Sequence, residues 1–385
     1  MSNRALYLSQ GFLILRGVLD PDRDLTPLKN AYSELVDDLV KYALGNNYAT
    51  TESEYRTLDF PQRFASLVGL THGSVFDHLD PSLNVYSTSY RRWKNAPSAQ
   101  PAELFELIRH PRILDALEGL IGSEIWATPA YHNNIKLASS HLKQAKRAER
   151  LACKPGLLHA SGLYRSTFLD DFQMHSTPWH MDEYPGLDSE SKHDYINVWL
   201  PLTEKEPGLA ELLVLPGSHL NGYRKFPVER ENEAIALNTQ PGDIVIMAGK
   251  LFHSSKKNQT ADSYRWAINM RYTPVGHRCG RRILPGFVAR SRKHPETQLQ
   301  DAVLWSKYWD AALNYLDCYL YPVKHVFDLS VKQVDEHERH WKKILPDPDS
   351  WLDLHRHGTR TMALRTLILR RAERLRGYLS VLSPK

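Results

Sequence analysis

The sequence predicts a mainly β core with flanking helices, an α+β fold, from two observations. Alternating apolar runs that are typical of strands gather in the second half of the chain, at residues 194–202, 244–247 and 264–271. Helical periodicity occurs nearer the ends, in residues 26–43 and again from about Thr361. Each element must bury its apolar face, so this order predicts one β core with helical elements on both sides.

The N-terminal part is predicted to hold a strand, a long helix and a helix pair. Residues 11–19 indicate a short buried strand, and Thr26 before Pro27 predicts the N-cap and first residue of the helix that follows. Residues 45–100 show few periodic signals, so we expect an irregular segment, either a surface connection or a pocket wall. Helices are expected at 101–110 and 111–121.

Composition restricts the class of protein. With 385 residues and 42% apolar content, the chain can bury one large core or two modest ones. Its net charge of +5 is low for a dedicated nucleic-acid binder. Three cysteines far apart in the sequence indicate neither a disulfide framework nor a thiolate metal site. No membrane-spanning run or signal core is evident, and we expect a cytoplasmic protein that does not bind membranes.

A cluster of candidate metal ligands lies near the middle of the chain. On a strand, residues i and i+2 share a face, so His180 and Asp182 would present an imidazole and a carboxylate side by side. His253, which follows the strand-like run 244–247, is a candidate for the second imidazole. Two histidines and one carboxylate form the facial triad that binds non-haem Fe(II) and leaves positions open. The pattern therefore predicts an iron site.

The order of these motifs resembles the phytanoyl-CoA dioxygenase family of Fe(II)/2-oxoglutarate oxygenases. The resemblance extends from Trp179 to Arg271 and includes the Pro-Gly-Ser-His segment at 216–219. It implies a double-stranded β-helix, or jelly-roll, barrel with N-terminal and C-terminal helical elements. It also implies that Fe(II), 2-oxoglutarate and O₂ take part in the reaction. In this resemblance the residues that are both catalytic and metal-binding are His180, Asp182 and His253.

The same resemblance implies four residues that bind the co-substrate. Arg265 is expected to bind the far carboxylate of 2-oxoglutarate, because a planar guanidinium binds a carboxylate through two hydrogen bonds. Ser255 would donate a hydroxyl to the same carboxylate, with Trp199 and Lys136 beside the co-substrate. Arg271 shares a strand face with Arg265 and is the alternative anchor or a substrate contact. A packed core tryptophan and a solvated strand-end lysine are the competing interpretations for Trp199 and Lys136.

Two further histidines are expected not to bind the metal. His219 belongs to the Pro-Gly-Ser-His turn, which is structural in the family, and His175 would face the substrate or support the ligands. In halogenases that resemble this family a small residue replaces the carboxylate. Asp182 is present here, so hydroxylation is the expected reaction, with desaturation and ring formation as alternatives.

We predict an oxygenase domain at residues 1–285 and a C-terminal helical extension at 286–385. The insertion at 139–170 is basic and is either a solvated helix face or a lid. The extension could pack on the barrel or form a homodimer interface, and its last helix, rich in arginine, could also lie on an acidic surface.

The function predicted from sequence is hydroxylation, or another oxidation, of a small-molecule metabolite in a specialised biosynthetic pathway. 2-Oxoglutarate would be decarboxylated to succinate and CO₂. The alternative is a catalytically silent barrel that serves as a binding or regulatory module. Oxidation of nucleic acid is disfavoured, because the basic segments do not interleave aromatic residues as single-strand binding surfaces do.

Overall fold

The computed structural model describes residues 2–45, 54–84, 93, 95–152, 174, 176–182, 195–221, 226–277 and 284–315. Within these ranges, no helix combines the length and apolar composition needed to cross a membrane. Short helical turns accompany the main elements, including a π-helical turn at Pro21–Leu25. The described part of the chain forms two antiparallel sheets and a set of surrounding helices.

The larger sheet has six strands in the order β1-β6-β3-β8-β2-β9, and every neighbouring pair is antiparallel. Its strands are β1 (Phe12–Leu15), β2 (Ile125–Lys136), β3 (Ile196–Pro201), β6 (Ile244–Ala248), β8 (Arg265–Pro274) and β9 (Phe287–Arg290). The smaller sheet has the order β5-β4-β7, with β4 (Leu212–Val214), β5 (Ile235–Ala236) and β7 (His253–Ser255). A β core with flanking helices, as the sequence predicts, is therefore confirmed.

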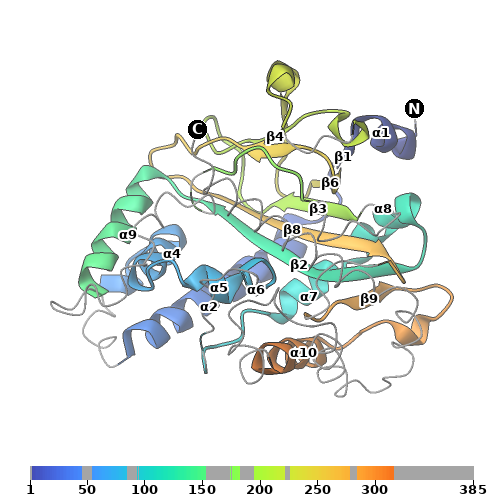
Figure 1. The fold of residues 1–385 in the computed structure, drawn as a ribbon. Helices are drawn as coiled ribbons and strands as arrows, with labels where there is room; N and C mark the ends of the chain where they lie inside the picture. Colours follow the sequence, from blue (N-terminus) through green and yellow to red (C-terminus); the bar gives the residue numbers. More distant parts are fainter. Residues whose placement is uncertain are drawn as a thin grey trace, which may run out of the picture.

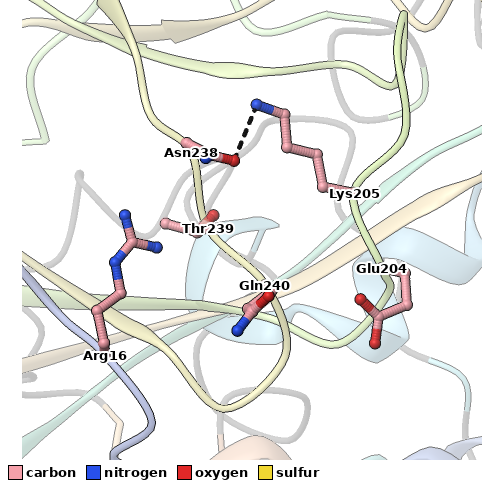
Figure 2. A pocket seen from close by; sticks show the side chains of 6 residues that line it. All are labelled: Arg16, Glu204, Lys205, Asn238, Thr239 and Gln240. Carbon is pink, nitrogen blue, oxygen red and sulfur yellow. Dashed lines mark hydrogen bonds between the residues drawn. The ribbon is translucent and has the colours of Figure 1, made fainter.

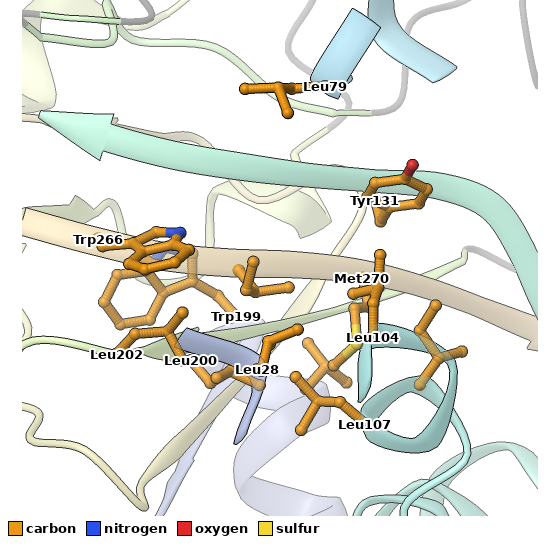
Figure 3. Packing of buried hydrophobic residues seen from close by; sticks show 14 of the residues in the cluster. Leu28, Leu79, Leu104, Leu107, Tyr131, Trp199, Leu200, Leu202, Trp266 and Met270 are labelled. Atoms are coloured by element: carbon orange, nitrogen blue, oxygen red, sulfur yellow. The ribbon is translucent and has the colours of Figure 1, made fainter. Parts of the chain in front are cut away.

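Helices cover one face of the larger sheet, while β4 of the smaller sheet lies on its other side (Figure 1). The covering helices are α2 (Thr26–Leu44), α4 (Phe60–Leu70), α5 (Val75–Leu79), α6 (Pro81–Asn84), α7 (Ala102–Ile108) and α10 (Ala302–Tyr315). In Figure 3, Leu104 and Leu107 of α7 lie against Met270 of β8 in the buried cluster. Each such buried side chain contributes about 1.5–3 kcal/mol to folding. Residues that alternate with this core along the strands face the other way, toward the smaller sheet.

The remaining helices lie at the margins of the sheet: α1 (Asn3–Gln10), α8 (Pro111–Ile121) and α9 (Ser139–Ala152). Helix α9 packs closely on α4, where Gly69 leaves room for the backbone carbonyl of Ala145. Lys143 and Lys146 are exposed on the outer side of α9, as is Arg147, which pairs with Glu54 at 2.5 Å. This part of the predicted insertion is thus a solvated helix face, and residues 153–170 lie outside the described ranges.

Two predictions for the N-terminal region are wrong. Thr26 does not cap α2 with its side chain, because its hydroxyl donates to the carbonyl of Pro21, at the start of the π-helical turn. Asp20 caps this turn by accepting from the backbone N–H groups of Asp22 and Arg23. Residues 45–100 are not uniformly irregular, because α4, α5 and α6 occur within 60–84.

The larger sheet extends beyond residue 285, where we predicted the end of the oxygenase domain. Strand β9 pairs with β2 on the sheet edge, so residues 287–290 complete the sheet rather than begin a helical extension. Trp305 and Trp309 of α10 are buried in the hydrophobic core. The division into two domains stays a prediction. The helix predicted from about Thr361 and the predicted dimer interface lie outside the described ranges.

We expect Asp80→Asn to stabilise the protein at alkaline pH. The Asp80 side chain is 2% exposed and accepts from the backbone N–H of Asn133 at 2.9 Å; burial raises its pKa from 3.8 to about 7. The folded state therefore retains a proton that the unfolded chain loses at about pH 4, so stability falls as pH rises from 4 through 7.

Asp80→Asn should raise the free energy of unfolding by about 1.5 kcal/mol at pH 5 and by up to about 4 kcal/mol at pH 8, because each pH unit between the unfolded and folded pKa values costs the wild type about 1.4 kcal/mol. Denaturant unfolding of both proteins at the two pH values measures this difference. Equal differences at pH 5 and pH 8 would show that Asp80 does not titrate in this range.

Candidate metal centre

The smaller sheet holds the first part of the site. His253 is the first residue of β7, and residues 177–180 run antiparallel to this strand. The backbone N–H of His180 donates to the carbonyl of His253 at 3.0 Å, and the reciprocal bond is 2.9 Å. His180 is thus fixed by a single β-bridge rather than by a regular strand, and Asp182 follows it.

The three predicted ligands converge. Their metal-binding atoms all lie within 4.8 Å of one another, close enough to hold a metal ion. The Nε2 atoms of His180 and His253 each lie 3.8 Å from a carboxylate oxygen of Asp182, the first from Oδ1 and the second from Oδ2. The His180 side chain is 25% exposed and that of His253 only 8%, so the cluster opens to solvent beside His180.

Both imidazoles are oriented by their own backbone. Nδ1 of His180 lies 2.8 Å from the carbonyl of Pro178, and Nδ1 of His253 lies 3.0 Å from the carbonyl of Leu251. A carbonyl can only accept, so Nδ1 carries the proton and Nε2 keeps a lone pair. Burial and the neighbouring His253 lower the pKa of His180 to about 4, which keeps it neutral at pH 7. These are the tautomer and charge that a metal ligand needs.

Asp182 is bound from the larger sheet. Arg271 of β8 donates from Nη2 to Oδ1 of Asp182 at 2.7 Å, and Asn269 lies 3.5 Å from Oδ2. Burial alone would raise the pKa of the Asp182 carboxyl, but the facing Arg271, with smaller effects of the histidines, holds it well below its ordinary value. The carboxylate is therefore ionised, and it connects the two sheets.

A hydrophobic cluster packs around the residues that alternate with the ligands in the segment 179–182. Its members are Trp179, Met181, Leu215, Phe226 and Phe252. The Trp179 and Phe226 rings stack with centroids 4.3 Å apart, and Phe252 meets Phe226 edge to face. Trp179 and Met181 therefore alternate with the ligands His180 and Asp182, the side-chain alternation expected of extended backbone. Packing of these neighbours restrains the ligands.

Arg265 is a buried cation at the start of β8. It is 6% exposed, donates from Nη1 to the carbonyl of Ala210 at 2.8 Å, and lies over the Trp199 ring at 5.8 Å. In the described ranges no carboxylate lies within ion-pair distance of Arg265, and its buried Nε has no hydrogen-bond partner. Burial lowers its pKa to about 10, so it remains charged at neutral pH. This arrangement leaves a place for an anion.

Lys136 and Ser255 are two further residues that were predicted to bind the co-substrate together with Arg265. Lys136 is fully buried, so its interpretation as a solvated lysine at a strand end is wrong. It lies directly opposite Arg265 in the antiparallel register of β2 and β8. Ser255 lies two residues beyond His253 on the same face of β7. Its hydroxyl accepts from the backbone N–H of Thr177 at 2.8 Å and keeps its own proton to donate.

The sequence interpretation missed two amides of the site. Asn197 of β3 is paired with Arg271 across the sheet and accepts from its Nε at 3.2 Å; Asn269 contacts Asp182. Alternation along β3, on which Asn197 and Trp199 share a face, was the available signal. His219 lies apart from the ligand cluster in the described structure, with Nε2 3.2 Å from the carbonyl of Leu8. His175 lies outside the described ranges.

A separate surface pocket of about 490 Å³ is lined by Arg16, Glu204, Lys205, Asn238, Thr239 and Gln240 (Figure 2). Its two cations already have partners: Arg16 pairs with Asp243 at 2.6 Å, and Lys205 contacts Glu211 and Asn238. None of the predicted site residues lines it. This pocket is therefore separate from the candidate metal centre.

Two imidazoles that present Nε2 to an ionised carboxylate, between two antiparallel sheets, define the class of protein: a candidate mononuclear metal protein with a β core. The family follows from the sequence. Residues 94–267 match the model of the phytanoyl-CoA dioxygenase (PhyH) family. The matched segment includes His180, Asp182, His253 and Arg265, so the predicted resemblance is confirmed. None of the curated proteins compared matches the chain.

Several solved structures are similar to this chain at low identity. A non-heme monooxygenase, ThoJ in complex with nickel, is 17% identical over 87% of this chain and 99% of its own, with a TM-score of 0.47. The α-ketoglutarate-dependent epimerase SnoN from nogalamycin biosynthesis is 17% identical over 71% and 82%, with a TM-score of 0.38. EctD from S. alaskensis is 16% identical over 72% and 79%, with a TM-score of 0.40.

Proposed function

We propose that this protein is an Fe(II)- and 2-oxoglutarate-dependent dioxygenase that hydroxylates, or otherwise oxidises, a small-molecule metabolite in a specialised biosynthetic pathway. The convergence of His180, Asp182 and His253 carries this proposal. Two imidazoles with free Nε2 lone pairs and one ionised carboxylate are the donor set of the facial triad. A structural zinc site would need a fourth protein ligand, and within the described residues the cluster has three.

The co-substrate is supported by the charge of Arg265. A buried guanidinium without a carboxylate partner is costly unless a ligand supplies the anion. The far carboxylate of 2-oxoglutarate would accept from its free Nε, with Ser255 and Lys136 as further donors. Trp199 would form the wall beside it, because its ring already faces the guanidinium.

The two sheets support the double-stranded β-helix implied by the resemblance. In that fold the sheets face each other, and the site lies between them. His253 comes from the smaller sheet, whereas Asn269 and Arg271, which contact Asp182, come from the larger one. We infer that the sheets are the two layers of such a barrel.

Each residue then has a defined task. When bound, Fe(II) with 2-oxoglutarate supplies the activation of O₂, and 2-oxoglutarate is converted to succinate and CO₂. The backbone carbonyls of Pro178 and Leu251 hold the ligand histidines in the metal-binding tautomer. Arg265 orients the co-substrate. The more exposed side, next to His180, is where we expect the substrate to enter.

Anaerobic titration of the purified protein with Fe(II) and 2-oxoglutarate tests this function. We expect the weak visible charge-transfer band of the chelated keto acid in the wild type. The band should be lost in His180→Ala and reduced or shifted in Asp182→Asn, which keeps the shape of the side chain. Asp38→Ala is the matched control, because this exposed carboxylate contacts Lys41 on a helix surface.

No band in folded wild-type protein would contradict the proposal and favour a binding or regulatory module that retains the barrel. A band that persists unchanged in both His180→Ala and Asp182→Asn would show that the keto acid is chelated elsewhere. If the band behaves as expected, candidate small metabolites can be screened by measuring succinate formation.

A further inference from the structure

Arg271 has contacts that a simple substrate-binding residue does not require. Its Nη2 donates to Oδ1 of Asp182 at 2.7 Å, and its Nε donates to Oδ1 of Asn197 at 3.2 Å. Its guanidinium lies over the ring of Tyr195 at 5.3 Å. The side chains of Arg271 and Asp182 are 7% and 8% exposed. The guanidinium is therefore fixed on one oxygen of the candidate metal ligand.

The two oxygens of Asp182 have unequal hydrogen-bond partners. Oδ1 accepts a short charge-assisted bond from Arg271, whereas within the described residues Oδ2 accepts a single, longer hydrogen bond, at 3.5 Å from the amide of Asn269. A charge-assisted bond is about twice as strong as a neutral one. Because Oδ1 is engaged, Oδ2 is the oxygen with electron density available to a metal.

We propose that Arg271 is a positioning residue that restricts Asp182 to one-oxygen coordination through Oδ2. This inference rests on the proposed function. A carboxylate that binds through both oxygens occupies an additional position on the metal, and the facial triad depends on open positions. Arg271, oriented by Asn197, thereby keeps open the positions that a bidentate keto acid requires.

The test uses the full-length protein, with Arg271→Met and Arg271→Lys as variants and Arg290→Met as control. Arg290 forms a surface network with Asp115 and Glu118 outside the site. Fe(II) affinity is measured by anaerobic competition with a chelator, and the Fe(II)/2-oxoglutarate band is recorded. Loss of an outer-shell partner typically lowers metal affinity by about 10- to 100-fold.

For Arg271→Met we expect a loss of Fe(II) affinity in that range together with a lost or shifted band. Arg271→Lys should recover part of both, because an ammonium keeps the charge but forms fewer oriented bonds. Arg290→Met should behave as wild type. Fe(II) affinity and band position are properties that a purely structural arginine would not change in folded protein.

Asn197→Ala keeps the test valid if Arg271→Met does not fold. This variant leaves both charges in place and removes only the acceptor that orients the Nε of Arg271. We expect a smaller change of the same kind. If the folded Arg271 and Asn197 variants had wild-type affinity for Fe(II) and an unchanged band, the inference about Arg271 would be overturned and the proposed function would stand. Failure of the wild type to bind Fe(II) and 2-oxoglutarate would instead overturn the proposed function.

Discussion

His180→Ala and His253→Ala should each abolish Fe(II)-dependent conversion of 2-oxoglutarate to succinate. We expect a loss of about 10³-fold or more, because removal of a ligand forfeits several kcal/mol of charge stabilisation by the metal. Both imidazoles present Nε2 to the same carboxylate, so neither can replace the other. Succinate formation and Fe(II) affinity measure the effect, with folding checked by thermal unfolding.

The histidine variants are cleaner than removal of Asp182. Truncating Asp182 leaves Arg271 buried without its partner, which typically costs about 3–5 kcal/mol and complicates any loss of activity. His219→Ala is the matched control, because this histidine contacts the carbonyl of Leu8 away from the cluster. Full activity in His180→Ala or His253→Ala would show that the triad assignment is wrong.

The ligand pair was predictable from sequence for a local reason. Residues i and i+2 share a face in any extended segment, so His180 and Asp182 come together even though a single bridge replaces a regular strand. Strands such as β3 and β8 were likewise predictable from their alternating apolar residues. Helix α4 was not predicted, although Phe64, Leu67 and Val68 have helical spacing and are buried. The helix is short, and the polar segments on either side of it show no helical periodicity.

Contacts between strands were harder to predict. Alternation indicated that Arg265 and Arg271 share a face, but the register across β3, β8 and β2 determines which group each one meets. In the structure, Arg271 faces Asn197, whereas Arg265 faces Lys136 and Trp199. One sequence does not give this register, because it depends on pairing between segments far apart in the chain.

Arg265→Met should strongly weaken binding of 2-oxoglutarate while leaving the apo protein folded. Loss of one partner of a buried, hydrogen-bonded charge pair costs about 2–5 kcal/mol, which corresponds to roughly 30-fold to several thousand-fold in affinity. The affinity of Arg265→Lys for 2-oxoglutarate should lie between those of the wild type and Arg265→Met, since lysine offers a point charge instead of a planar pair of donors. Titration of the charge-transfer band with 2-oxoglutarate at fixed Fe(II) gives the affinity of each variant.

Without 2-oxoglutarate, Arg265→Met should have a second effect, an increase in the stability of the protein. Arg265 contacts a carbonyl and an aromatic ring but no carboxylate in the described structure, so its burial opposes folding until an anion binds. Replacing it with Met should therefore raise the Tm without ligand and abolish the rise that 2-oxoglutarate causes in the wild type. An arginine with a purely structural role would lower the Tm when replaced. Unchanged 2-oxoglutarate affinity in folded Arg265→Met would exclude Arg265 as the anchor and leave Arg271 as the alternative.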